Sequence, residues 1–333
     1  MRRLLALVPL LLAAAPAAAQ AATPTTAAPT IKLVVEKAGG DRDPIALSGE
    51  RFRVRVIVTP YVPGQTVTVR IERGASKLRV KQLAIVQPQG ATAGQALIGF
   101  TPKRGGRLRI RASHLATPEL GTAVAPERTV SVVTAKVSDG GRGPSVRLLQ
   151  RLLVSKGYVT GQRGLFDART ARAVLAFRKL SGLQRTSVAD RQVFRRLVRG
   201  GGTFKVRYPN HGHHVEADLT HQVMALIDGG RVQRIYPISS GAPVTPTVLG
   251  SFRVYRKDPG TNAKGMVFSS YFTGGYAIHG YAQVPIYPAS HGCLRTPVPD
   301  AVPIYDWVKF GDRVDVYYRA GKHDSKRISN PGP

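Results

Sequence analysis

The chain has 333 residues, a mass of 35.8 kDa and 43% hydrophobic residues, so it can bury more than one core, and a wholly disordered protein is excluded. Forty-nine basic against nineteen acidic side chains give a net charge of +30 and a pI near 11.1, which favours anionic partners such as nucleic acid, acidic lipid or anionic cell-wall polymer. Cys293 is the only cysteine, which excludes an internal disulfide and a zinc site with several cysteine ligands from this chain.

The first residues have the pattern of an export signal. Arg2 and Arg3 precede an apolar run, and the small residues 17–19 fit a signal-peptidase site, so we predict a signal peptide over 1–19. The protein is then exported to the periplasm or cell wall, and loss of the two arginines lowers its charge from +30 to +28. We expect no nucleic-acid partner there. No apolar run reaches the ~20 residues that cross a bilayer, so we also expect no membrane span.

Alternating apolar and polar residues indicate a β domain over 31–137. The clearest case is 51–56, where Phe or Val alternates with Arg, and the period of two indicates a half-buried strand. Similar runs, separated by turns with Gly or Pro, predict about seven strands in roughly a hundred residues, which is typical of an Ig-like β-sandwich. The lone His114 carries no chemistry there. We therefore interpret this domain as a spacer or docking unit.

Helical periodicity begins after a linker-like segment at Ser138 and predicts three short helices over 143–199. Gly157 is placed to end the first helix, and Asp167 and Asp190 to cap the second and third. The stretch SVRLLQRLLVSKGYVTGQRGLFDARTARAVLAFRKLSGL resembles the peptidoglycan-binding domain 1 family. That resemblance implies a small three-helix bundle that contacts peptidoglycan. A basic helical spacer remains the alternative.

A third, β-rich domain is predicted over 203–319. Gly200–Gly202 is expected to be a second flexible joint, and short strands follow with one helix near residues 300–308, in which Trp307 packs in the core. The polar tail 320–333 is predicted to be disordered. Three histidines are clustered in the sequence: His211, His213 and His214. Such a cluster can bind a metal, but we interpret these histidines as solvated because they lie in a Gly-rich loop without a nearby cysteine.

The single thiol stands in the segment SHGCLR and is preceded by IHG at 278–280. A cysteine with an ordinary pKa of about 8.5 becomes nucleophilic when an imidazole or a cation acts on it, and His279 and His291 are the candidates. Gly292 allows the backbone to approach closely and to present N–H groups to an oxyanion. The alternative is a purely structural role, in which the thiol is buried and the neighbouring histidines have no catalytic function. An exported protein gains nothing from an unpaired oxidisable thiol, so we favour acyl transfer.

These motifs resemble the L,D-transpeptidase catalytic domain, the YkuD family. Beside IHG and SHGCLR, the segments DLTHQVMALIDGGRVQRIYPISSG, TPTVLGSFRV and MVFSSYFTGGYAIHG are similar to family segments, and together they cover 203 to about 318. The resemblance implies Cys293 as nucleophile, His279 as general base and later acid, and His291 as a support of the loop and thiolate. It also implies an oxyanion hole made by the amides of Gly292 and Cys293, substrate contacts from Ser290, Arg295 and Tyr271, and no metal or cofactor.

The reaction implied is transfer of a peptidoglycan stem peptide onto a second stem, with loss of D-alanine and a 3→3 cross-link. Two other functions stay open. An L,D-carboxypeptidase would use the same thioester with water as acceptor, and a non-catalytic wall-binding protein would use only the accessory domains and the charge. The expected partners are donor and acceptor stem peptides and anionic cell-wall polymers.

Overall fold

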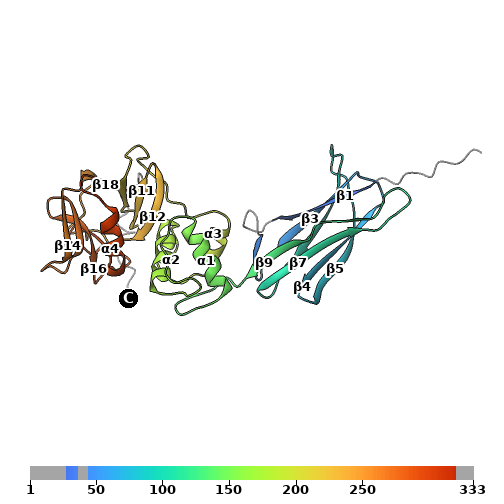
Figure 1. Cartoon of the computed structure of the whole chain (residues 1–333), viewed down its shortest axis with the longest axis horizontal. Helices are drawn as coiled ribbons and strands as arrows, with labels where there is room; N and C mark the ends of the chain where they lie inside the picture. The colour runs from blue at the N-terminus through green and yellow to red at the C-terminus, as the bar shows by residue number, and fades with distance from the viewer. Residues whose placement is uncertain (1–27, 37–43, 320–333) are drawn as a thin grey trace, which may run out of the picture.

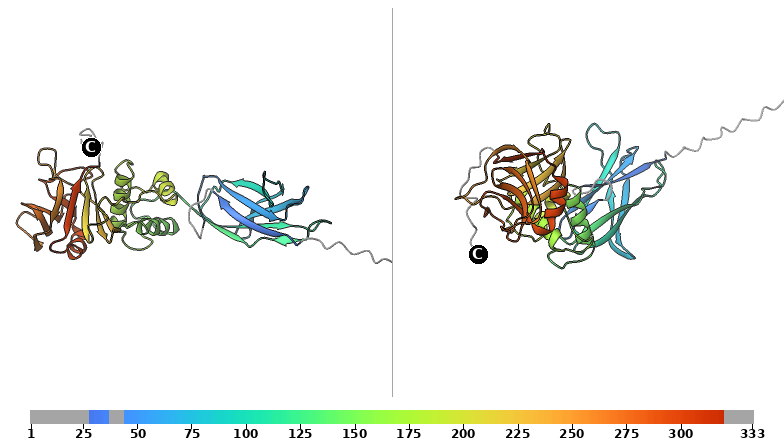
Figure 2. Two further views of the ribbon diagram at one scale, coloured as in Figure 1. Left: turned by 90° about the horizontal axis from the view of Figure 1, so that it is seen from above. Right: turned by 60° about the vertical axis from the view of Figure 1, so that its left-hand side comes forward.

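The computed structural model describes residues 28–36 and 44–319, so the predicted signal peptide and C-terminal tail lie outside the described residues. Figure 1 shows three bodies in a row along the long axis, a β body, a helical body and a second β body, and Figure 2 shows the narrow connection between the first two. The fold is β-rich, with four helices among the described residues. No helix there is long and apolar enough to cross a membrane.

The N-terminal body consists of two sheets around one core. β3 is the middle strand of the three-stranded sheet β1-β3-β6, and β2-β9-β7-β4-β5 form the larger sheet, with β8 paired to β7. Apolar side chains at alternate positions of β3 and β4 enter the same hydrophobic cluster, because successive side chains of a strand point to opposite faces. The strands are β1 (Thr30–Glu36), β2 (Ile45–Leu47), β3 (Phe52–Thr59), β4 (Thr66–Arg73), β5 (Ser76–Ala84), β6 (Gly94–Phe100), β7 (Gly106–His114), β8 (Ala123–Val124) and β9 (Arg128–Val133).

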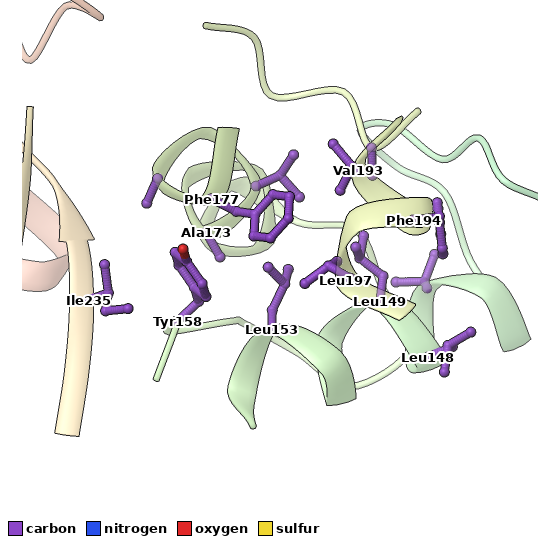
Figure 3. Close-up of a cluster of buried hydrophobic side chains, with 14 of the residues drawn as sticks. Leu148, Leu149, Leu153, Tyr158, Ala173, Phe177, Val193, Phe194, Leu197 and Ile235 are labelled. Atoms are coloured by element: carbon purple, nitrogen blue, oxygen red, sulfur yellow. The ribbon is translucent and has the colours of Figure 1, made fainter. Parts of the chain in front are cut away.

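Three helices form the middle body: α1 (Pro144–Val154), α2 (Ala168–Leu180) and α3 (Arg191–Val198). The Asp167 carboxylate accepts the Thr170 amide and the Asp190 carboxylate accepts the amides of Gln192 and Val193, so both aspartates are N-caps as their positions predict. Gly157 adopts φ +90° just after α1, a conformation that favours glycine. The helices bury a common apolar cluster, shown in Figure 3.

The C-terminal body has two sheets and α4 (Val298–Trp307). The five-stranded sheet has the order β12-β11-β10-β18-β13 and the four-stranded sheet the order β14-β15-β16-β17. Their bounds are β10 (His214–Asp218), β11 (Val223–Asp228), β12 (Arg231–Pro237), β13 (Gly250–Arg253), β14 (Arg256–Thr261), β15 (Val267–Thr273), β16 (Tyr276–Tyr281), β17 (Leu294–Pro297) and β18 (Arg313–Tyr317). Trp307 packs at the edge of the core between them and stacks on His213, with ring centroids 3.7 Å apart.

The helical body shares a core with the five-stranded sheet. Along β11, Val223, Ala225 and Ile227 pack with the helices, whereas Met224 and Leu226 pack into the C-terminal core. Tyr158 lies between the helices and Ile235 of β12 (Figure 3), where the Ile235 amide donates to the Gly157 carbonyl at 2.8 Å. Both faces of this sheet are therefore buried.

The prediction of a flexible joint at Gly200–Gly202 is wrong. The Tyr158 hydroxyl donates to the Gly202 carbonyl at 2.8 Å, and the Lys156 ammonium donates to the Gly200 carbonyl at 2.7 Å. Glycine composition alone does not show that neighbouring side chains satisfy a segment's carbonyls, and these bonds fix it against the helical body.

Candidate active site

Two adjacent parallel strands bring the predicted nucleophile and base together. β16 and β17 pair with His279 opposite Arg295, and Cys293 lies two residues before Arg295 along the chain. His279 and Arg295 therefore lie side by side on one face of this sheet, Cys293 directly precedes β17, and the charge of Arg295 acts on both the thiol and the imidazole. The register of the two strands therefore brings His279 next to the segment that carries Cys293, although the two residues are far apart in the sequence.

His279 is buried and has a defined tautomer. Its Nδ1 lies 2.9 Å from the Gly280 carbonyl oxygen, which only accepts, so Nδ1 carries the hydrogen and Nε2 keeps a free lone pair. Burial lowers the pKa of His279 to about 4; the bond to Gly280 opposes this shift and the charge of Arg295 adds to it. The imidazole is therefore neutral at pH 7 and can accept a proton.

Cys293 is partly buried beside a small apolar cluster of Met266, Tyr271 and Ala277. Burial raises the pKa of the Cys293 thiol, although a hydrogen bond from the Ala277 backbone and the charges of Arg295 and Lys264 oppose the rise. The resting pair is thus a neutral thiol and a neutral imidazole. Such a pair acts by general-base removal of the thiol proton during attack, not through a preformed thiolate.

The loop before Cys293 is held by its own serine. Ser290 is buried, its hydroxyl donates to the Cys293 carbonyl at 2.6 Å and accepts the Gly292 amide at 3.1 Å. Gly292 adopts φ +110°, and a Cβ built there would lie 1.7 Å from Cε1 of Tyr276. Glycine is therefore required at 292 both by the backbone and by the Tyr276 ring.

A second loop, 239–247, fixes the SHGC loop from the other side. The Ser240 carbonyl accepts the amides of Ala289 and Ser290 at 2.9 Å each. The Ser290 carbonyl in turn accepts the Ala242 amide at 2.8 Å and the Thr245 hydroxyl at 2.9 Å. These contacts could not be predicted from the sequence, since hydroxyls and backbone groups far apart in the chain leave no local pattern.

The remaining candidates take different positions. Arg295 lies over the Tyr281 ring at 4.1 Å and donates to the Ala289 carbonyl at 3.2 Å. Tyr271 forms one side of the cluster at the thiol, with the Arg256 guanidinium 4.1 Å from its ring. His291 is exposed and makes no hydrogen bond or ring contact to another described residue. The structure thus brings together the thiol, His279, Arg295 and Tyr271, and leaves His291 in solvent.

The prediction of solvated histidines is wrong, because each of the three has an acidic partner, although the side chains of His211 and His213 remain 26% and 22% exposed. His214 is fully buried in β10 and its Nε2 lies 3.4 Å from Glu216, while His211 and His213 contact Asp315 and Asp312 at 2.9 Å and 2.8 Å. Acidic partners distant in sequence were not visible in the local Gly-rich pattern. Within 28–36 and 44–319, no group of three or more potential ligands is placed to hold a metal ion.

The C-terminal body is a β-rich domain in which a thiol and a neutral imidazole lie at the end of one sheet. Residues 212–316 match the L,D-transpeptidase catalytic domain, YkuD, and residues 142–197 match a putative peptidoglycan binding domain, so the chain is similar to enzymes that transfer acyl groups. A search of curated proteins finds no match.

Three solved structures are similar to parts of this chain. An L,D-transpeptidase from Xylanimonas cellulosilytica is 33% identical, with 56% of this chain and 98% of that chain covered and a TM-score of 0.52. The catalytic domain from Enterococcus faecium L,D-transpeptidase is 28% identical over 32% of this chain and 98% of that one, with a TM-score of 0.28. An L,D-transpeptidase from Mycobacterium smegmatis is 15% identical over 86% and 99%, with a TM-score of 0.28. The chain belongs to the L,D-transpeptidase family, an assignment that rests on the Xylanimonas structure.

Proposed function

We propose that this protein is an exported L,D-transpeptidase that forms 3→3 peptidoglycan cross-links through a thioester at Cys293. The observation that carries the proposal is the pairing of His279 with Arg295 on adjacent parallel strands, with Cys293 directly before β17 and the free Nε2 of a neutral imidazole available as base. Membership of the L,D-transpeptidase family supports the substrate class.

The reaction has two acyl transfers. The Cys293 sulfur attacks the carbonyl of the third stem residue while His279 Nε2 takes the thiol proton; the C–N bond to D-alanine then breaks, and the imidazolium returns the proton to the departing amine. The side-chain amine of an acceptor stem attacks the thioester, passes a proton through His279 to the sulfur and frees Cys293. No metal or cofactor enters either step.

The oxyanion would be stabilised by the Gly292 and Cys293 amides. Before substrate binds, the Gly292 amide donates a hydrogen bond to Ser290 Oγ. To stabilise the oxyanion, this amide must either turn away from the hydroxyl or donate to both oxygens at once. Ser290 is better supported as a residue that positions the loop than as a substrate contact, since both hydrogen bonds of its hydroxyl stay within the loop and its backbone bonds the loop at 239–247. Tyr271 belongs to the apolar cluster at the thiol and the charge of Arg295 acts on the thiol, so both suit substrate contact.

We assign the remaining parts as follows. Residues 1–19 are a signal peptide and 31–137 an Ig-like spacer; 143–199 bind peptidoglycan, 203–319 are catalytic and 320–333 form a basic tail. The protein acts in the periplasm or cell wall in peptidoglycan synthesis and thereby in cell shape. Its net charge also favours weak, salt-sensitive contacts with anionic wall polymers.

Intact-mass and product analysis test the activity. The full chain and its Cys293→Ala variant are each incubated with a disaccharide-tetrapeptide. A cross-linked dimer and a thioester adduct in the parent alone are the expected result. Tripeptide without dimer would make the protein an L,D-carboxypeptidase, and unchanged substrate would make it a non-catalytic wall-binding protein.

A further inference from the structure

A cleft between the N-terminal β body and the helical body has a cationic rim. Its volume is about 730 Å³, and residues from β7, β9, α1 and the loop after α1 line it. Four arginines reach it from three different segments: Arg107 of β7, Arg147 and Arg151 of α1, and Arg163 of the loop. No acidic side chain of the described residues lines this cleft.

The side chains of these four arginines have no partner among the described residues. None of the four guanidinium groups makes a hydrogen bond, ion pair or ring contact to residues 28–36 or 44–319. Other arginines at the same junction are paired, since Glu50 holds Arg195 at 2.7 Å and Arg191 at 3.8 Å. Four unpaired like charges around one concavity repel each other and concentrate an attractive field for anions, so the cleft lacks its counter-charge.

The floor of the cleft is apolar. Ile45, Val132, Val133 and Leu148 are buried beneath it. A ligand that matches both features carries several anionic groups for the rim and small apolar groups for the floor. Guanidinium groups bind carboxylates in a planar, bidentate manner. An acidic peptide fits this description, whereas a phosphodiester polymer has little to bury against the floor.

The junction that forms the cleft is fixed. Ile45, Leu47, Val133 and Ala135 of the β body belong to the same hydrophobic cluster as the three helices. The Val137 amide and carbonyl also exchange hydrogen bonds with Ala189, at 2.9 Å and 3.0 Å. The rim charges are therefore held in place before any ligand binds, which lowers the entropic cost of binding.

We propose that this cleft is a binding site for an acidic peptide with small apolar side chains, and that an uncross-linked peptidoglycan stem is its natural form. The choice of a stem rests on the family assignment, but the site does not use Cys293 or any group of the catalytic body. Its second wall comes from the N-terminal β body, which gives that body a role beyond that of a spacer.

Binding is measured by fluorescence anisotropy on the full chain in the Cys293→Ala background, which prevents turnover of the probe. The probe is a labelled stem tetrapeptide with free carboxylates. Arg147→Ala with Arg151→Ala removes two rim charges from α1, and Arg53→Thr with Arg79→Thr removes two exposed, unpaired charges from β3 and β5, away from the cleft. We expect a loss of affinity of about tenfold or more in the first pair and less than twofold in the control. Equal losses in both pairs would refute the site, because only net charge would then matter.

A second pair and two further probes sharpen the test. Arg107→Thr with Arg163→Ala removes the two rim charges that come from β7 and from the loop after α1. We expect a similar loss of affinity for the peptide, and binding as tight as in the parent would overturn the proposal. The same peptide with amidated carboxylates should bind weakly and without dependence on the rim arginines. Poly(glycerol phosphate) is the second probe. If removal of the rim arginines weakens its binding more than it weakens binding of the peptide, the peptide assignment is wrong.

The proposal and the catalytic assignment can fail separately. The two rim variants are also made with Cys293 intact. We expect a carbapenem to acylate them at the parent rate, since these arginines lie outside the catalytic body that holds the thiol. If the parent itself is not acylated, the proposed function fails while the binding comparison stands. If acylation proceeds and the rim variants bind as the parent does, only the cleft site is refuted.

Discussion

Gly292 offers the sharpest test of the active-site geometry. A Cβ at 292 would lie 1.7, 2.4 and 2.8 Å from three atoms of the Tyr276 ring, and the backbone there has φ +110°. An unfavourable backbone region costs about 1–3 kcal/mol, and overpacking costs about 1–3 kcal/mol more. Gly292→Ala should therefore disfavour the reactive loop by roughly 2–6 kcal/mol. At about 1.4 kcal/mol per factor of ten, acylation of Cys293 by a carbapenem slows by roughly 30-fold or more.

Gly275→Ala is the matched control for this substitution. Gly275 lies next to Tyr276, has no positive φ, and a Cβ there meets no atom within 4 Å. We expect an acylation rate within about twofold of the parent. Tyr276→Ala combined with Gly292→Ala should recover the part of the loss due to the ring but not the part due to φ. The reasoning is refuted if Gly292→Ala is acylated within threefold of the parent rate, or if removal of the ring recovers nothing.

Four further outcomes follow from the site and its surroundings. Cys293→Ala should abolish the covalent carbapenem adduct in intact-mass spectra with an unchanged melting temperature, and an adduct on another residue would contradict the nucleophile. His279→Ala should slow acylation by ~10²–10⁴-fold, whereas the exposed His291→Ala should change it less; the reverse order would move the base role to His291. Because the pKa of His279 is lowered to about 4, the acid limb of the acylation profile should fall near pH 4 and not near 6.5. Burial opposes the charge on His214, but the hydrogen bonds to Glu216 and Gly212 raise its pKa above 6.5 on balance, so its stabilisation is full below pH 6.5 and is lost as the pH rises through the raised pKa. The melting temperature of the parent should then drop more between pH 6 and 8 than that of His214→Gln.

Local sequence features were sufficient where the physics is local. Capping by Asp167 and Asp190 depends on a carboxylate two or three residues before the amides it accepts, so the positions of α2 and α3 could be predicted. The period of two in β3 depends only on which face of the strand is buried. Cys293 and His279 could be proposed as catalytic residues because a thiol among His, Gly and Ser has few structural explanations in a chain that we expect to be exported.

Other features are set by contacts between distant segments. The pairing of Ser240 with Ser290 and the approach of Tyr276 to Gly292 depend on how β16 and β17 lie against the loop at 239–247. The sequence predicted a flexible Gly200–Gly202 and solvated histidines, because it does not show that Tyr158 and Asp315 reach those segments.

The sequence by itself therefore determined the helix ends, and it supplied the residue types that we propose for the active site, since both follow from side-chain chemistry and short-range hydrogen bonding. Only the tertiary structure decided which histidine is buried beside Arg295, through the register of two parallel strands, and which arginine side chains lack a partner among the described residues. Strand register and the burial of a charge are properties of the packed chain, because each depends on groups that come together only when separate elements fold against one another.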